Sequence, residues 1–205
     1  MKEKRQAKFR RKTKETDIEI SINLDGRGGT KIKTCIGFLD HMLTLFAYHG
    51  LFDLKIKVRK QDLNVDLHHT NEDIGICLGQ VVSRALKSKK GICRYGFAAV
   101  PMDEALVRVS MDLSSRPSLH TFESFKTIPL LLKTKNKNIY NYENAKQFLH
   151  AFSDAAGINM HIETICGDDL HHVLEALFKA SGRALSAATR IDKRRKGIPS
   201  SKGML

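Results

Sequence analysis

The sequence predicts an α+β fold built from two tandem, similar β-β-α-β-α repeats, each a small sheet with helices on one face, in a pseudo-two-fold duplicated domain. Segments with alternating apolar residues are followed by segments with helical spacing, and this order occurs twice. Residues 108–116 align with residues 19–27, and both long helical segments open with His-His-x-x-Glu and have glycine eleven residues after the first histidine. These matches indicate an internal duplication.

Each element of the first repeat has its own signal. Ile18, Ile20 and Ile22 alternate with polar residues, which is typical of a half-buried strand. The glycine-rich residues 25–29 predict a turn, and Asp40 lies in the first turn of a helical segment, where a carboxylate suits the helix dipole. The predicted elements are strands over 18–24, 30–36 and 51–59 and helices over 38–48 and 68–86.

The second repeat follows the same order less completely. Its predicted elements are strands over 106–113 and 158–165 and helices over 147–155 and 168–189, with a break at 114–117. Residues 121–142 have no counterpart in the first repeat, and the Lys/Asn-rich residues 133–141 predict an exposed loop. The expected divisions are a basic N-terminal tail over 1–13, repeats over 14–93 and 94–191, and a C-terminal tail over 192–205.

Composition and charge limit the possible classes of protein. The chain has 205 residues, a formal net charge of +13 and four dispersed cysteines without a C-x-x-C motif, which predicts reduced thiols in a cytoplasmic protein. It contains no run of 18 apolar residues, so no membrane span is expected. The charge fits nucleic-acid binding or an enzyme acting on anionic small molecules. Aromatic residues do not interleave with Lys and Arg, so no nucleic-acid partner is expected.

The two copies of His-His-x-x-Glu carry candidate metal ligands. Residues four apart share a helix face, whereas adjacent histidines point about 100° apart, so the doubled histidines fit two ions better than one. Imidazole and carboxylate groups together bind manganese, iron, zinc or nickel. His41, beside Asp40, is either a further ligand or a hydrogen-bonded structural residue. The candidate ligands in the two copies are His68, His69, Glu72, His171, His172 and Glu175.

Six motifs extend over most of the chain. They are Thr-Lys-Glu-Thr (13–16), Gly-Phe-Leu-Asp-His-Met-Leu (37–43), Asp-Leu-His-His-Thr-Asn-Glu-Asp (66–73), Pro-Met-Asp-Glu-Ala-Leu (101–106), His-His-Val-Leu-Glu-Ala-Leu-Phe-Lys-Ala (171–180) and Pro-Ser-Ser-Lys-Gly (199–203). From about residue 8 to the C-terminus, this set resembles the imidazoleglycerol-phosphate dehydratase family. The resemblance implies a lyase of histidine biosynthesis that dehydrates imidazole glycerol phosphate to imidazole acetol phosphate. It also implies two Mn²⁺ ions per site and a homo-oligomer of 24 subunits with sites between subunits.

The implied reaction breaks a C–H bond that no adjacent carbonyl acidifies. The resemblance implies metal ions that act as Lewis acids on the ring nitrogens, so that the ring becomes imidazolate-like and expels the hydroxyl. The electron-poor, diazafulvene-like intermediate that results would have an acidified C–H bond. A carboxylate then removes the proton, and the enol becomes the ketone. The resemblance assigns Glu15 as this base, with Glu72, Glu175 and Lys179 as further catalytic residues.

Carried over position by position, the resemblance implies two overlapping sets of site residues. The metal-ligand positions are His41, His68, His69, Glu72, His171, His172 and Glu175. The substrate-binding positions are Glu15, His41, His49, His68, Glu72, Arg94, Arg116, His171, Lys179, Ser200, Ser201 and Lys202. Among them Arg94, Arg116, Ser200, Ser201 and Lys202 match phosphate-binding positions, which makes residues 192–205 a substrate-binding tail.

Three positions depart from the family pattern. Gln147 stands where the family commonly has histidine and occasionally glutamate, and the duplication places it opposite His41. An amide oxygen is a weaker ligand than imidazole, and His150 or a water molecule could complete the shell. Cys35 and Ser115 replace glycine, which matters where the backbone needs a positive φ.

Two alternatives remain open at this point. Paired ions also suit a two-metal phosphate-ester hydrolase, although such sites usually rely on Asp-rich ligand sets. The high pI, about 9.7, would also suit a basic nucleic-acid-binding domain. The substrate imidazole as a metal ligand favours the dehydratase over the hydrolase, and the sequence shows no RNA- or DNA-binding signature.

Overall fold

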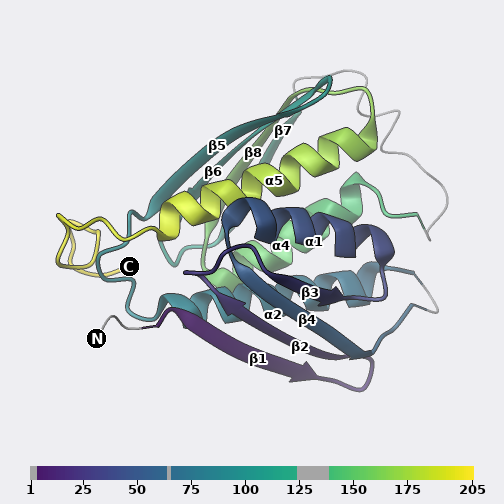
Figure 1. The fold of residues 1–205 in the computed structure, drawn as a ribbon, viewed down its shortest axis with the longest axis horizontal. Helices are drawn as coiled ribbons and strands as arrows, with labels where there is room; N and C mark the ends of the chain where they lie inside the picture. The colour runs from purple at the N-terminus through teal and green to yellow at the C-terminus, as the bar shows by residue number, and fades with distance from the viewer. Residues whose placement is uncertain (1–3, 64–65, 124–138) are drawn as a thin grey trace.

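The computed structural model describes residues 4–63, 66–123 and 139–205, in which two four-stranded sheets enclose four helices (Figure 1). The sheets have the strand orders β1-β2-β4-β3 and β5-β6-β8-β7. The strands are β1 Gln6–Lys12, β2 Asp17–Asn23, β3 Thr30–Lys33, β4 Asp53–Lys60, β5 Tyr95–Met102, β6 Ala105–Asp112, β7 Ser118–Glu123 and β8 Asn159–Cys166. The helices are α1 Gly37–Gly50, α2 His68–Leu86, α4 Tyr142–Ala156 and α5 Leu170–Thr189.

Both halves of the chain have one topology. In each half the first strand pairs antiparallel with the second, the second antiparallel with the fourth, and the third parallel with the fourth. Each second strand has a register shift near its start, between Asp17 and Ile18 in β2 and between Leu106 and Val107 in β6. The predicted α+β fold with a duplicated architecture is therefore confirmed. The division of the chain at residue 94 stays a prediction.

The structure adds three strands, β1, β5 and β7, to the predicted elements, so each half has the order β-β-β-α-β-α. Residues expected in the basic N-terminal tail form β1, because Lys8, Arg10 and Lys12 face solvent while Ala7 and Phe9 turn inward. The guanidinium of Arg84 covers the Phe9 ring at 4.3 Å. In β5 the alternation is reversed: Phe97 is exposed, and Gly96 is buried against α5.

The segment 121–142 is described only at its ends. Residues 121–123 complete β7, and Asn141 caps α4 by accepting a hydrogen bond from the Asn144 backbone N–H at 3.0 Å. The Asn144 side chain accepts one from the Asn141 N–H, and this capping box starts α4 before the predicted start at 147. Residues 124–138, with most of the predicted exposed loop, lie outside the described residues.

Helices from opposite halves pack in pairs, α1 against α5 and α2 against α4. The glycines that match in the sequence lie at these contacts. A Cβ atom on Gly79 would lie 2.5 Å from the carbonyl oxygen of Phe152, and one on Gly182 would lie 2.2 Å from that of Phe46. The duplicated glycines therefore allow both helix pairs to approach closely.

We expect Gly182→Ala to lower the free energy of unfolding by about 1–3 kcal/mol, because the new methyl group meets a backbone carbonyl that cannot rotate away. Urea unfolding followed by circular dichroism measures the change. Gly37→Ala is the matched control, since a Cβ atom there meets nothing within 4 Å and alanine favours a helix. Equal stability of the two variants would contradict the close helix contact.

Candidate functional site

The first cluster of predicted ligands lies where α1 meets the start of α5. His41 Nε2 lies 2.9 Å and His171 Nε2 lies 3.1 Å from Glu175 Oε1. Lys179 Nζ donates to Glu175 Oε2 at 2.6 Å. The four-residue spacing puts these α5 side chains on one helix face. The side chain of Asp169 caps this helix by accepting a hydrogen bond from the His171 backbone N–H at 2.7 Å.

The carboxyl group of Glu175 is ionised although it is buried. Burial disfavours the charged form, but hydrogen bonds from Lys179 and His41 outweigh it and lower the pKa of Glu175 to about 2. The potential ligand atoms of His41, His171 and Glu175 all lie within 4.8 Å of one another. Two imidazoles and an ionised carboxylate at this spacing fit Mn²⁺ or another divalent first-row transition metal.

The second cluster lies at the contact between α2 and α4. His68 Nε2 lies 3.4 Å from Glu72 Oε2, and His68 Nδ1 lies 2.9 Å from Gln147 Oε1. These side chains and His150 border a cavity of about 330 Å³. Since an amide oxygen only accepts hydrogen bonds, this contact assigns the proton of His68 to Nδ1 and leaves the Nε2 lone pair for a metal.

The duplication relates the two clusters to each other. His68 on α2 corresponds to His171 on α5, and Gln147 on α4 takes the place that His41 has on α1. The second cluster therefore has one imidazole fewer than the first. His150, one turn beyond Gln147, lies with its Nδ1 3.2 Å from a carboxylate oxygen of Asp154.

The second histidine of each copy turns away from its cluster. His69 Nδ1 lies 2.9 Å from Asp62 Oδ2, and His172 Nδ1 lies 2.8 Å from Glu104 Oε2. These hydrogen bonds raise the pKa of both histidines. A carboxylate on Nδ1 orients an imidazole whose Nε2 binds a metal. Sequence reasoning missed both carboxylates: Glu104 lies in the motif 101–106, whereas Asp62 has no local signal.

Glu15, the predicted base, lies in the turn between β1 and β2. Its side chain is 59% exposed, and its Oε2 lies 3.7 Å from His69 Nδ1. Glu15, Asp62 and His69 form a second group whose potential ligand atoms lie within 4.8 Å of one another. In the described part of one chain, this group has no residue in common with the group of His41, His171 and Glu175.

The predicted phosphate-binding residues lie near the C-terminal end of α5. Arg94 donates to both carboxylate oxygens of Asp112 at 2.7 and 3.0 Å and to the carbonyl oxygen of Pro199 at 2.9 Å. These bonds hold the C-terminal segment against the start of β5. Arg116 and Lys202 are exposed, and neither side chain makes a hydrogen bond or ion pair with the described residues. The other predicted residues of this segment, which follow Pro199, are Ser200 and Ser201.

Two positions at which the resemblance predicts glycine have a left-handed backbone. The φ angles are 70° at Cys35 and 62° at Ser115, a conformation that costs a side-chain-bearing residue about 1–2 kcal/mol. The buried Lys89, which the sequence did not single out, donates to Ser115 Oγ at 2.9 Å and to the Leu113 carbonyl oxygen at 3.1 Å. These bonds stabilise the turn that presents Arg116.

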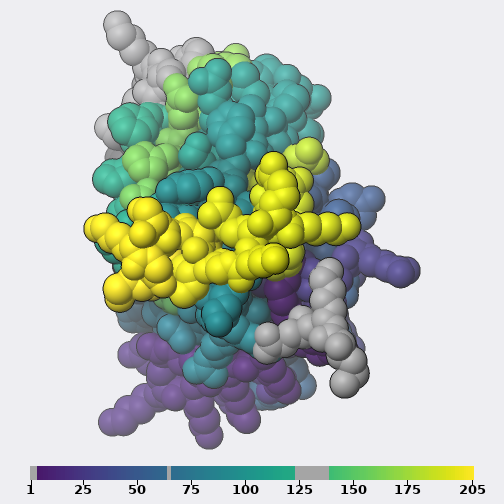
Figure 2. Space-filling model, turned by 90° about the vertical axis from the view of Figure 1, so that its left-hand side faces the viewer, coloured from purple at the N-terminus to yellow at the C-terminus, as the bar shows by residue number. Residues whose placement is uncertain are grey.

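The predicted metal and phosphate residues of one chain lie at opposite ends of α5. Glu175 lies in its second turn, whereas the Arg94 backbone N–H bonds to the Ala188 carbonyl oxygen in its last turn at 2.9 Å. At about 1.5 Å per residue, the helix from Glu175 to Ala188 spans roughly 20 Å. In Figure 1 both α2 and α5 begin on the right, and the C-terminal segment lies on the left. Figure 2 shows this yellow segment exposed across that end of the molecule.

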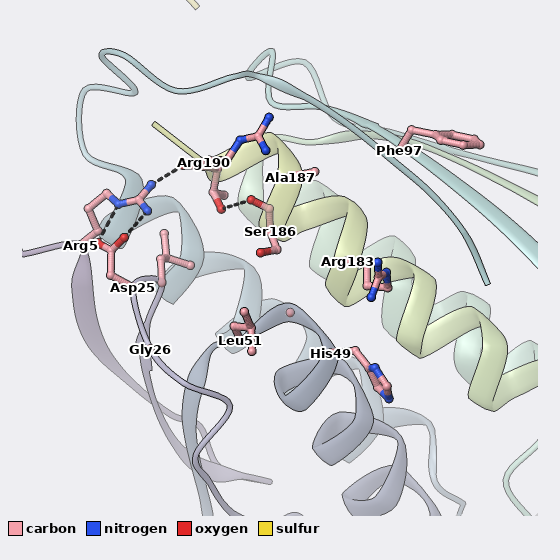
Figure 3. Close-up of a pocket in the computed structure, with 13 residues that line it drawn as sticks. Arg5, Asp25, Gly26, His49, Leu51, Phe97, Arg183, Ser186, Ala187 and Arg190 are labelled. Carbon is pink, nitrogen blue, oxygen red and sulfur yellow. Dashed lines mark hydrogen bonds and ion pairs between the residues drawn. The ribbon is translucent and has the colours of Figure 1, made fainter. Parts of the chain in front are cut away.

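His49, a predicted substrate-binding residue, lies two turns beyond His41 in the last turn of α1. It borders a cavity of about 470 Å³. Across this cavity Arg183 projects from the facing helix α5 (Figure 3). Burial, followed by the charges of Lys179 and Arg183, lowers the pKa of His49, so its ring is neutral and can accept a hydrogen bond at neutral pH.

Comparisons with known proteins identify the family of this chain. The family model described as imidazoleglycerol-phosphate dehydratase matches residues 34–185. A relative named imidazoleglycerol-phosphate dehydratase, from Thermoanaerobacter pseudethanolicus, is 52% identical over 201 residues, which cover 98% of this chain and 100% of the relative. The chain belongs to the imidazoleglycerol-phosphate dehydratase family.

Solved structures of imidazoleglycerol-phosphate dehydratases have the same fold. The enzyme from Staphylococcus aureus matches with a TM-score of 0.76 and 36% identity, covering 91% of this chain and 99% of that one. The enzyme from Pyrococcus furiosus, solved in complex with (S)-C348, matches with a TM-score of 0.77 and 36% identity, covering 96% and 100%. The predicted family is therefore confirmed by sequence and by structure.

Membership in the imidazoleglycerol-phosphate dehydratase family makes this protein a hydro-lyase, a metal-dependent dehydratase that acts on a small substrate in histidine biosynthesis. The alternatives of a phosphate-ester hydrolase and a nucleic-acid-binding domain find no support in these comparisons. In the described part of the chain, no helix is long and apolar enough to cross a membrane.

Proposed function

We propose that this enzyme dehydrates imidazole glycerol phosphate to imidazole acetol phosphate with two Mn²⁺ ions, at sites shared between subunits of a 24-chain homo-oligomer. The separation of the metal and phosphate residues along α5 is the observation that carries the shared site. A three-carbon chain joins the ring and phosphate of the substrate, so the substrate is far shorter than roughly 20 Å. A neighbouring chain must therefore supply one of the two groups. The free cysteines Cys35, Cys77, Cys93 and Cys166 support a cytoplasmic location.

The first ion would be held by His41, His171 and Glu175, whose potential ligand atoms already converge. His69 cannot bind the same ion as its neighbour His68, because its ring faces Asp62. In the same way, His172 cannot bind the same ion as His171, because its ring faces Glu104. The Nε2 atoms of His69 and His172 would instead complete the shells of ions held by neighbouring chains. When bound, such ions act as Lewis acids on the substrate imidazole.

The second ion would be held by His68 and Glu72. The amide oxygen of Gln147 lies against the same ring, and His150 borders the same cavity. Either of these side chains or a water molecule would complete the shell. Because an amide is a weaker ligand than imidazole, this position would bind its ion less tightly than the first.

The remaining predicted residues would bind and position the substrate. Glu15 would take the proton from carbon, since its exposed carboxylate lies beside the outward-facing His69. Lys179, fixed by its bond to Glu175, would contact substrate oxygens. The exposed cations Arg116 and Lys202 would bind the phosphate through charge-assisted hydrogen bonds.

Turnover of imidazole glycerol phosphate in the presence of Mn²⁺ tests this function. We expect the ketone product to form without release of inorganic phosphate and a chelator to abolish its formation, because the imidazole and carboxylate clusters need an ion to act. Ketone detection and a phosphate assay on the same sample separate dehydration from hydrolysis. Phosphate release without ketone would contradict the proposal.

A further inference from the structure

The outer face of the first sheet, which faces away from the helices, is densely basic. Along the strands every second side chain points outward. The strand register places two rows of residues side by side across the four strands. One row consists of Lys8, Ser21, Lys55 and Lys31, and the next row consists of Arg10, Glu19, Lys57 and Lys33. These eight residues, here called the basic face, include no residue of the predicted active site.

The carboxylates near this face are already paired. Glu19 lies 3.0 Å from Lys8 Nζ and 3.3 Å from an Arg59 nitrogen. Asp17 binds Arg10, with its two oxygens 2.6 and 2.8 Å from the guanidinium nitrogens. On the basic face, four lysines of β3 and β4 make no hydrogen bond or ion pair with any residue that the structure describes. Those lysines are Lys31, Lys33, Lys55 and Lys57.

The pairing of β3 with β4 brings these charges together. Lys31 lies directly opposite Lys55, and Lys33 directly opposite Lys57. Like charges directly opposite each other on one sheet face are destabilising. Glu19, which lies opposite Lys57 on β2, is already paired with Lys8 and Arg59, and among the described residues no carboxylate forms an ion pair with these four lysines. A bound anion would offset the repulsion between these lysines, so the basic face favours anion binding.

The shape and chemistry of the face select the kind of anion. The two rows border a groove of about 550 Å³, lined by Lys8, Glu19, Ser21, Lys31, Lys33, Lys55, Ile56 and Lys57. None of these side chains is aromatic, so no base can stack as in single-stranded nucleic-acid binding. Lysine ammonium groups bind phosphate oxygens as point charges. Neighbouring strands lie about 4.8 Å apart, so several such charges face one ligand at once.

We propose that the basic face binds a short chain of linked phosphate groups, held mainly by Lys31, Lys33, Lys55 and Lys57. This site lies on the outer face of the first sheet, whereas the metal clusters lie on the helices. It does not depend on the proposed active site.

Titration of the full enzyme with tripolyphosphate in a calorimeter tests this proposal. We expect saturable binding that weakens as salt is raised, because exposed charges are screened. The double variant Lys31→Gln/Lys33→Gln should lose about tenfold in affinity, since half of the unpaired lysines are removed. Turnover of imidazole glycerol phosphate should not change, because the basic face contains no predicted active-site residue.

A second double variant, Lys90→Gln/Arg108→Gln, removes the same charge from exposed positions elsewhere and should bind almost as wild type does. Equal losses in the two double variants would show that only overall charge matters and would overturn the site. Absence of saturable binding to the wild type would also overturn it. Tighter binding of a DNA duplex than of tripolyphosphate at equal phosphate concentration would overturn the assignment to phosphate chains. Thermal unfolding confirms that each variant is folded.

Discussion

Glu175→Gln is expected to lower turnover of imidazole glycerol phosphate by at least about 100-fold and to lower the metal content of the enzyme. The substitution keeps the shape of the side chain but removes the charge that holds His41, His171 and Lys179 around it. An amide nitrogen in this place would face one of these donors without an acceptor. Because the pKa of Glu175 is about 2, the wild-type carboxylate is ionised at every usual assay pH. The amide of the variant carries no charge at any of these pH values, so raising the pH should not restore activity.

Elemental analysis and turnover, measured on the same gel-filtered sample, check this expectation. Glu163→Gln is the matched control, because this glutamate on β8 is 40% exposed and pairs only weakly with Arg108 at 3.3 Å. The control should keep its metal and its activity. Full metal content together with full turnover in Glu175→Gln would exclude this residue from the ligand set.

The elements with strong periodicity were predictable from the sequence. The helix predicted over 68–86 begins and ends where α2 does, and the alternation of Ile18, Ile20 and Ile22 identifies the buried face of β2. The strands β1, β5 and β7 could not be predicted because their side chains reverse or hide the usual pattern. Phe97 is exposed while Gly96 is buried, since α5 approaches the backbone there too closely for any side chain.

The candidate site was predictable where its residues lie on one helix. The spacing of His171 and Glu175 alone places them on a shared face. Partners from distant loops, such as Asp62 on His69, could not be predicted, because nothing local marks a side chain that becomes adjacent only on folding. The sequence also could not show that the predicted metal and phosphate residues lie at opposite ends of α5, a property of the packed helices and the C-terminal segment.

Mixed assemblies of two inactive variants are expected to regain activity. Glu175→Gln damages the metal end of a chain, and the double variant Arg116→Ala/Lys202→Ala damages its phosphate end. Neither change lies near the other, because roughly 20 Å of α5 separates the two groups. If each site takes its metal ligands from one chain and its phosphate residues from another, random mixing gives intact sites at about a quarter of positions.

Turnover per site of such a mixed assembly, co-expressed with two different tags and purified through both, tests the shared site most directly. The proposed arrangement predicts about a quarter of wild-type activity in the mixture and almost none in either parent variant. Activity of the mixture no greater than the average of the two parents would show that each chain builds its site alone, and would contradict the account.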